Sequence, residues 1–228
     1  MTTLAVLQPG YLPWLGFFDQ VARADVFVIY DDVQYDHGGW RNRNRVKSRD
    51  SVVWLTVPVL HSNRMGQSID TVEIAPNTHW ARKHLTTIAQ AYARAPFLLR
   101  YLPELEAILM RPWQRLVDLD MALIASLCGW LDLNPPEQRA STLGIAGGRS
   151  SRLIALCQHF GADTYLSGNA AKSYLDIGAF AAAGISVEWQ NYSHPVYPQQ
   201  HGPFVSHLSV LDLLLNVGPD SARLVRSS

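Results

Sequence analysis

The stretch LAVLQPGYLPWLGFFDQVARADVFVIYDD, residues 4–32, decides the fold. It opens with an apolar run at 4–7 that stops at Gln8-Pro9-Gly10, as a buried strand entering a loop does. Residues 15–22 then carry apolar side chains at helical spacing, after Pro13 in a position that suits a first helical turn. The run at 26–30 is apolar on both faces, which is typical of a central strand in a parallel sheet. The stretch therefore predicts a Rossmann-like βαβ unit in an α/β protein with a mostly parallel sheet.

Working outward, residues 36–51 are interpreted as a polar loop rich in arginine and asparagine. Period-two patterns predict strands at 52–59 and 69–74, and helical spacing predicts helices at 79–93, 103–109 and 113–131. A break at 134–136 and a glycine-rich loop at 144–149 precede a helix that Ser150 or Ser151 caps and Gly161 ends.

The second half of the chain is expected to be rich in helices. Short strands are predicted at 165–168 and 186–189 around a helix at 179–183, and a last helix at 209–215. We expect one domain over residues 1–228, with 1–134 and 135–218 as its subdivision and 219–228 as a mobile tail.

Composition and charge exclude several classes of function. Hydrophobic residues make up 48% and charged residues 17% of the 228, as in a packed globular protein. The net charge of zero provides no field that favours DNA or an anionic membrane. Neither a leader pattern nor an apolar run of membrane-spanning length is present, so we expect a cytoplasmic protein. Cys128 and Cys157 fall on apolar helix faces and are interpreted as inert core residues.

The loop at 8–16 is the first candidate site. It places Gln8, Tyr11 and Trp14 beside a helix N-terminus, where free backbone N–H groups attract phosphate or carboxylate. We predict that these three residues bind substrate. The alternative is a stiff aromatic loop that only closes the core.

Asp31, Asp32 and Gln34 follow the second strand, at the edge of the sheet where ligands bind in open α/β folds. Successive residues of a strand point to opposite faces, so the two acids are not expected to act as a close pair. Asp32 is predicted as a catalytic proton acceptor, with Asp31 and Gln34 as substrate contacts. The alternative is that at least one acid caps a helix or pairs with an arginine.

Residues 40–47, WRNRNRVK, combine a stacking face with planar cations that match carboxylate and phosphate geometry. The predicted substrate contacts are Trp40, Arg41, Asn42, Arg43 and Lys47. A solvated basic loop is the alternative, and one such cluster in a neutral chain is thin support for binding of single-stranded nucleic acid.

His84 is the predicted general base, because the pKa of a histidine suits neutral pH. A structural role on its helix is the alternative. His79 and His84 lie five residues apart and do not share a helix face, and no metal-ligand spacing occurs elsewhere. We therefore expect no metal and no cofactor.

Two further segments carry candidate substrate contacts. Ser150 and Ser151 open a helix after two glycines, which is the pattern of an anion nest or of a simple helix cap. Two prolines in 191–199 favour an extended backbone that presents His194, Tyr197 and Gln199. Core packing by the tyrosines is the alternative there.

Taken together, these segments resemble the WbqC-like family of bacterial proteins. The matching stretches cover nearly the whole chain: 8–16, 24–27, 31–34, 40–47, 55–59, 80–84, 165–168, 194–197 and 208–212. Members are associated with gene clusters that make O-antigen sugars and natural products. The resemblance implies modification of an amino sugar or another small amine by acyl or aminoacyl transfer.

The leading hypothesis is therefore amide formation from an activated donor. An acyl carrier protein, a CoA thioester or an aminoacyl-tRNA would supply the acyl group, and a small molecule such as a nucleotide sugar would accept it. His84 or Asp32 would take the proton, and Arg41, Asn42 or Gln8 would meet the developing oxyanion. One alternative is a nucleotidyl-transferring or adenylate-forming enzyme that uses ATP. The other is a non-catalytic module that binds a sugar nucleotide or a carrier protein.

Overall fold

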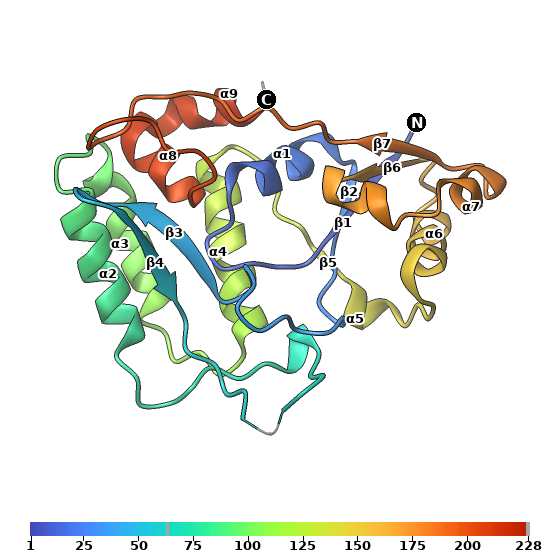
Figure 1. Cartoon of the computed structure of the whole chain (residues 1–228), viewed down its shortest axis with the longest axis horizontal. Helices are drawn as coiled ribbons and strands as arrows, with labels where there is room; N and C mark the ends of the chain where they lie inside the picture. Colours follow the sequence, from blue (N-terminus) through green and yellow to red (C-terminus); the bar gives the residue numbers. More distant parts are fainter. Residues whose placement is uncertain (63, 227–228) are drawn as a thin grey trace.

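The centre of the computed structural model, which describes residues 1–62 and 64–226, is a five-stranded sheet in the order β5-β2-β1-β6-β7 (Figure 1). Its strands are β1 (Thr3–Leu7), β2 (Val26–Ile29), β5 (Gln138–Arg139), β6 (Thr164–Ser167) and β7 (Ser186–Trp189). Every neighbouring pair is parallel, which confirms the predicted α/β class. The chain moves outward from β1 through β2 to β5 and then crosses to β6, so the strand order reverses between β1 and β6.

Helices cover both faces of this sheet, and each face has its own hydrophobic core. Ala5 belongs to the core under α1 (Leu15–Arg23), whereas Leu4 and Val6 belong to the core under α6 (Arg149–His159) and α7 (Ile177–Ala182). Because successive strand residues point to opposite faces, a sheet covered on both sides needs continuous apolar runs. This is why β1 and β2 are readable in the sequence.

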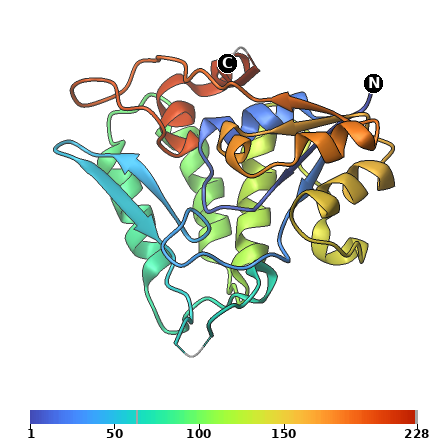
Figure 2. The same cartoon turned by 45° about the vertical axis from the view of Figure 1, so that its right-hand side comes forward.

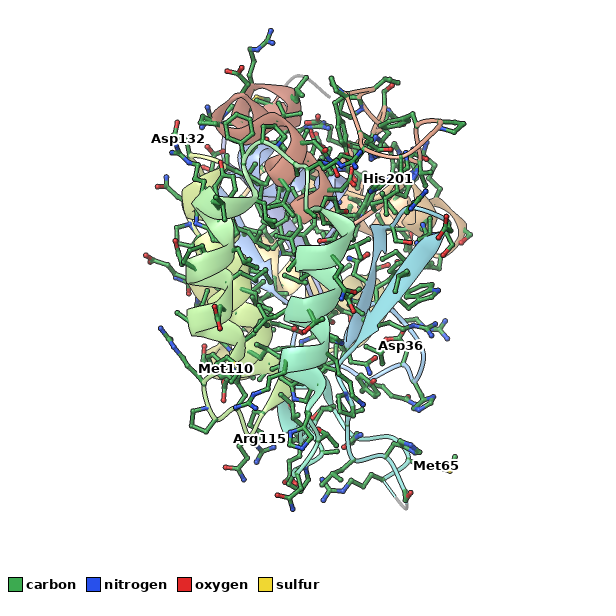
Figure 3. All side chains as sticks on the ribbon, turned by 90° about the vertical axis from the view of Figure 1, so that its left-hand side faces the viewer. Asp36, Met65, Met110, Arg115, Asp132 and His201 are labelled. Atoms are coloured by element: carbon green, nitrogen blue, oxygen red, sulfur yellow. The ribbon has the colours of Figure 1, made fainter. Side chains whose placement is uncertain are left out.

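A long insertion separates β2 from β5 in the sequence. It holds the antiparallel hairpin of β3 (Arg43–Lys47) and β4 (Val52–Thr56), a 3-10 turn η1 (Ile69–Thr71), and helices α2 (Trp80–Ala91), α3 (Leu98–Leu109) and α4 (Leu116–Trp130). The hairpin and α2 lie on the side of the molecule opposite to α6 and α7 in both cartoon views (Figures 1 and 2). Figure 3 shows Asp132, after α4, and Met110, after α3, toward opposite ends of these helices.

The C-terminal part returns to the first face of the sheet. After α5 (Ala140–Leu143), the 3-10 turn η2 (Asn169–Ser173) and β7, residues 190–209 cross the molecule as an irregular strap to α8 (Val210–Val217). The 3-10 turn η3 (Gly218–Asp220) and helix α9 (Ser221–Arg226) follow. Val225 is fully buried and α9 packs against α1, so most of the tail that we expected to be mobile is helical. Strands from both 1–134 and 135–218 share the one sheet.

Besides the tail, the structure differs from the sequence expectations at several elements. Residues 43–47 form β3 instead of a loop, residues 69–71 form a 3-10 turn instead of a strand, and β5 was not expected. Helix α3 begins at Leu98 and contains Pro103, the residue at which the sequence predicts its start. In β3, Asn44 and Val46 are buried while Arg43 and Arg45 are half-buried. Burial therefore alternates along the strand, but hydrophobicity does not, because Asn44 is polar.

Candidate functional site

A cavity of about 660 Å³ opens at the carboxyl ends of β1, β2 and β6, where the strand order reverses. This is the place where open α/β sheets bind ligands, and the volume falls within the range of about 300–1,000 Å³ for small-molecule sites. The lining residues used below are Gln8, Gly10, Trp14, Tyr30, Trp40, Arg41, Asn44, Arg149, Ser150, Tyr174 and His207. Apolar and aromatic side chains dominate the walls, and a few polar groups converge on them.

Gln8 and Arg41 form the polar pair of the cavity. Nη1 of Arg41 donates a hydrogen bond of 2.7 Å to Oε1 of Gln8, which leaves the Gln8 amide nitrogen to donate to a ligand. Burial lowers the pKa of Arg41, Asp36 at 3.8 Å opposes that effect, and an arginine stays cationic at neutral pH. The pair therefore presents hydrogen-bond donors and a positive charge in an apolar setting.

The loop after β1 is tied to the start of the hairpin by backbone contacts. The N–H of Tyr11 lies 3.0 Å from the carbonyl of Arg41 and 3.3 Å from that of Trp40. A Cβ at Gly10 would lie 3.0 Å from the same Trp40 carbonyl oxygen, so glycine permits this close approach. The contact brings Trp40 and Arg41 to the cavity although they lie about 30 residues after β1.

The two asparagines of this segment are engaged with the backbone. Nδ2 of Asn42 donates to the carbonyl of Val57 at 2.8 Å, and Nδ2 of Asn44 donates to that of Leu12 at 2.7 Å. Asn42 is buried, and its Nδ2 donates one hydrogen bond within the fold; its role at an oxyanion stays a prediction. Asn44 lines the cavity, although its sequence context did not single it out as a contact.

The histidine that lines the cavity is His207. Its ring stacks on Trp14 with centroids 5.2 Å apart, and its Nδ1 lies 2.8 Å from Oγ of Ser206. The backbone of His207 has φ +58°, which turns the strap just before α8. Sequence reasoning missed this residue because no motif surrounds it; the fold alone brings it beside Trp14.

His84 lies outside the cavity, behind the loop that follows β1. Its Nδ1 is 2.8 Å from the hydroxyl of Tyr11, and both side chains are buried. Burial lowers the pKa of His84 to about 4, against a smaller raising effect from the backbone of Thr56. The ring is therefore neutral at pH 7 and holds Tyr11 in place, which matches the structural alternative for both residues.

Asp31 and Asp32 point to different arginines, and neither lines the cavity. Asp31 is fully buried and accepts hydrogen bonds from Nε of Arg139 (2.7 Å) and from the N–H (3.0 Å) and hydroxyl (2.7 Å) of Ser141 at the start of α5. Asp32 pairs with Arg152, whose guanidinium lies over the ring of Tyr30, a cavity residue.

Gln34 forms an isolated bridge with Ser68 and also lies outside the cavity lining. Asp31 and Asp32 thus pair with arginines and Gln34 lies in a backbone bridge. Catalysis by Asp32 and substrate contacts by Asp31 and Gln34 stay predictions.

Lys47, Tyr197 and Gln199 come together, but around a buried carboxylate away from the cavity. Asp212 of α8 accepts hydrogen bonds from Tyr197 at 3.0 Å and from Gln199 at 2.7 Å, and Lys47 donates to Gln199 at 3.1 Å. Burial raises the pKa of Asp212, and these donors oppose that effect. These hydrogen bonds join the strap to β3 and α8. Lys47, Tyr197 and Gln199 are not among the residues that line the cavity, and their contact with substrate stays a prediction.

His194 lies in an aromatic cluster of the strap, with its ring 5.2 Å from that of His207 and 5.7 Å from that of Phe204. Burial lowers the pKa of His194, and a contact of its ring with the Pro195 carbonyl opposes this. The His194 ring contacts the cavity-lining His207, and it reaches the cavity-lining Trp14 through Tyr192.

The start of α6 forms one wall. Ser150 lines the cavity, and its hydroxyl accepts a hydrogen bond of 3.0 Å from the N–H of Asp176. Ser151 donates to the carbonyl of Gly148 at 2.8 Å and accepts from its N–H at 3.3 Å, so it caps the helix as the simpler interpretation holds. Arg149 lines the cavity beside them.

Burial raises the pKa of Cys128 and Cys157 to about 12, and neither lines the cavity. Among the described residues, no three histidine, cysteine or acidic side chains are grouped to hold a metal ion. In the same part of the chain, no helix combines the length and apolar character needed to cross a membrane.

Comparison with known proteins gives a consistent result. The model of the WbqC-like protein family matches residues 8–224. The uncharacterized protein Rv1507c of Mycobacterium tuberculosis is 35% identical over 228 residues, which cover 99% of this chain and 98% of the relative. No solved structure matches the chain. The chain therefore belongs to the WbqC-like protein family.

Proposed function

We propose that this protein is a transferase that forms an amide, moving an acyl or aminoacyl group from an activated thioester or ester to a small amine in the cavity at the end of β1. The observation that carries the proposal is that Gln8, Arg41 and His207 line one aromatic cavity of small-molecule size. Donors for an oxyanion and a proton acceptor are the two groups that such a transfer requires.

The proposed step uses these groups without a covalent protein intermediate. The amine nitrogen attacks the carbonyl carbon of the donor, and the Gln8 amide and the Arg41 guanidinium stabilise the negative charge on the carbonyl oxygen. The tetrahedral adduct collapses as the new C–N bond persists and the C–S or C–O bond breaks. His207 takes the proton that nitrogen loses and returns it to the leaving sulfur or oxygen, so atoms and charge balance.

His207 replaces the two bases proposed from the sequence. The Nδ1 of His84 faces Tyr11, and Asp32 faces Arg152. By contrast, His207 is exposed in the cavity wall, and its Nδ1 contact with Ser206 leaves Nε2 for the reacting amine. Imidazole is suited to this exchange near neutral pH.

The aromatic walls suit a ring-shaped acceptor. Trp14, Trp40 and Tyr174 offer flat faces of the kind that stack on sugar rings and bases, and the cavity has room for an amino sugar or another small amine. Holding the amine beside the donor carbonyl would by itself account for much of the acceleration.

A second candidate, nucleotidyl or adenylyl transfer, is favoured by one observation. Arg149 and the N-terminus of α6 form a wall of the cavity at the reversal of the strand order, where many doubly wound sheets hold phosphates. This reaction would consume ATP and release pyrophosphate, which separates it from amide transfer from a thioester.

The test is an activity screen with the full chain. Acetyl and aminoacyl thioesters are combined with a panel of nucleotide-linked and free amino sugars, and amide products are detected by mass spectrometry, with pyrophosphate release from ATP measured in parallel. We expect amide product without ATP, a loss of about 100-fold in His207→Asn, and a similar loss in Gln8→Leu. His159→Asn, an exposed histidine on α6, is the matched control and should keep its activity.

Pyrophosphate release from ATP that depends on the amino sugar would favour nucleotidyl or adenylyl transfer over amide transfer. Equal activity of His207→Asn and His159→Asn would refute the role of His207.

A further inference from the structure

The outward face of the β3–β4 hairpin carries a strip of two tryptophans and two arginines, which we call the hairpin strip: Trp40, Arg43, Arg45 and Trp54. Both tryptophans are 44% exposed, and their ring centroids lie 5.2 Å apart. The guanidinium of Arg43 lies 4.4 Å from the ring centre of Trp54, and that of Arg45 lies 5.4 Å from Trp40 and 5.6 Å from Trp54. Cations and rings therefore form one interleaved surface.

The strand register builds this surface. Arg45 is paired with Trp54 across the hairpin, and Arg43 lies two residues before Arg45 on the same face. The intervening Asn44 and Val46 point inward and are buried. The outward residues Arg43 and Arg45 can therefore contact a ligand without disturbing the core residues between them.

The positive charge of the strip is not balanced by acids. In the described part of the chain, neither Arg43 nor Arg45 has a carboxylate within 4.0 Å, whereas Arg23, Arg139 and Arg152 all do. Among the described residues, the buried Nε atoms of Arg43 and Arg45 also have no hydrogen-bond partner. Their other contacts are with backbone carbonyls of Gly38 and His207. A planar aromatic ligand that carries negative charge would stack on the tryptophan rings and pair with the guanidinium charges of the strip.

The strip is continuous with the proposed active site. Trp40 belongs to the strip and also lines the cavity. Nη2 of Arg45 donates a hydrogen bond of 3.1 Å to the carbonyl of His207, the proposed base. A ligand seated on the strip therefore lies at the mouth of the cavity, with its remainder directed to the reacting groups.

We propose that the hairpin strip binds the nucleotide end of a small thioester donor. The base stacks on the tryptophans, the phosphates contact Arg43 and Arg45, and the acyl thioester arm enters the cavity. This inference rests on the proposed amide transfer. A neutral sugar would leave both guanidinium groups without a counter-charge, and a chain with a net charge of zero has no extended field for a polynucleotide, so a single small nucleotide fits best.

The first experiment measures binding of coenzyme A and of adenosine bisphosphate to the full chain, by calorimetry and by quenching of tryptophan fluorescence. We expect both to bind, and Trp54→Leu and Arg43→Gln each to weaken binding by roughly tenfold, with Trp54→Phe recovering part of the loss. Arg49→Gln removes an equal charge from the exposed turn of the same hairpin and should bind as the wild type does.

Three results would overturn the inference: no binding of either nucleotide, binding that Trp54→Leu and Arg43→Gln leave unchanged, or a short single-stranded RNA that binds more tightly than coenzyme A through the same residues.

A second assay separates this inference from the proposed reaction. With a simple thioester that lacks a nucleotide, such as acetyl-N-acetylcysteamine, Arg43→Gln should change the KM less than it does with acetyl-CoA, whereas Arg49→Gln should keep the wild-type rate with both donors. With acetyl-CoA as donor, the KM should rise about tenfold in Arg43→Gln with little change in kcat.

If the strip does not bind nucleotides but the reaction is correct, both donors will be insensitive to Arg43→Gln. If the reaction is wrong and the strip is correct, nucleotide binding will depend on Trp54 and Arg43 while no amide product forms.

Discussion

The hydroxyl of Tyr11 lies 2.8 Å from Nδ1 of His84, and this buried contact joins the loop after β1 to helix α2. The two residues are 73 positions apart in the sequence. The loop carries Gln8 and Trp14, so one wall of the cavity is positioned by the long insertion between β2 and β5. Helix α2 of the insertion thus supports the loop after β1, while Trp40 and Arg41, just before the hairpin, line the cavity.

The His84 contact predicts a specific dependence of stability on pH. The folded protein keeps His84 neutral with a pKa of about 4, whereas the unfolded chain protonates it near its usual value of 6.5. Between these values the unfolded state binds more protons, so the stabilisation present above pH 6.5 is lost as pH falls toward 4, amounting to about 2 kcal/mol by pH 5. Urea unfolding of His84→Gln at pH 7 and pH 5 should show a correspondingly smaller loss than the wild type. Equal losses in the two proteins would contradict the burial of a neutral ring.

Asp31 and Asp32 should differ in their effect on folding. Asp31 is fully buried with three donors, and its removal leaves Arg139 without its nearest acid and α5 without its cap. Asp31→Ala should lower the free energy of unfolding by about 3–5 kcal/mol, as loss of one partner from a buried pair does. Asp32 is partly exposed, so Asp32→Ala should cost less, about 1 kcal/mol. Denaturant unfolding of both variants provides the comparison, and the reverse order would contradict these assignments.

The sequence predicts the strands of the sheet well where burial on both faces requires a continuous apolar run. The strands β1 and β2 are buried on both faces, and their apolar runs were recognised with the correct bounds to within one residue. In β3, the buried positions include Asn44, whose amide is satisfied by the Leu12 carbonyl, so a polar residue occupies a core position. The strand β5 has two residues, too few for any periodicity.

The site was predictable only in part, for a related reason. Gln8 and Trp14 follow the strand β1, which the sequence predicts, whereas Trp40 and Arg41 precede β3, which it does not; all four line the cavity. His207 reaches the cavity through the path of the strap, which no local pattern specifies. Residue type alone does not separate a ligand contact from a core contact, because Tyr197 and Gln199 are typical of both and hydrogen-bond to the buried Asp212.

The hydroxyls around Asp212 should act as a coupled group. Tyr92 donates to Oδ1 at 2.8 Å and Tyr197 to Oδ2 at 3.0 Å, and all three side chains are buried. Each Tyr→Phe change should lower the free energy of unfolding by about 1–3 kcal/mol, because it leaves a buried carboxylate short of one donor. The double variant should depart from the sum of the two single changes by at least about 0.5 kcal/mol. A strictly additive double-mutant cycle, measured by urea unfolding, would show that the two hydroxyls act independently.

The buried carboxyl of Asp120 leads us to expect that Asp120→Asn stabilises the protein. Its carboxyl is fully buried in α4 without a hydrogen-bond partner in the described part of the chain, and burial raises its pKa well above the usual range, against an opposing effect from Arg41. The folded state therefore keeps a proton that the unfolded state releases above pH 4, and stability falls as pH rises. Asp120→Asn removes this dependence, so its gain over the wild type should be small near pH 4 and reach about 1–3 kcal/mol at pH 8. Asp118→Asn, half-exposed on the same helix, is the control and should change stability by less than about 0.5 kcal/mol. Thermal and urea unfolding at the two pH values measure the difference, and a gain that does not grow with pH would show that Asp120 is ionised in the folded protein.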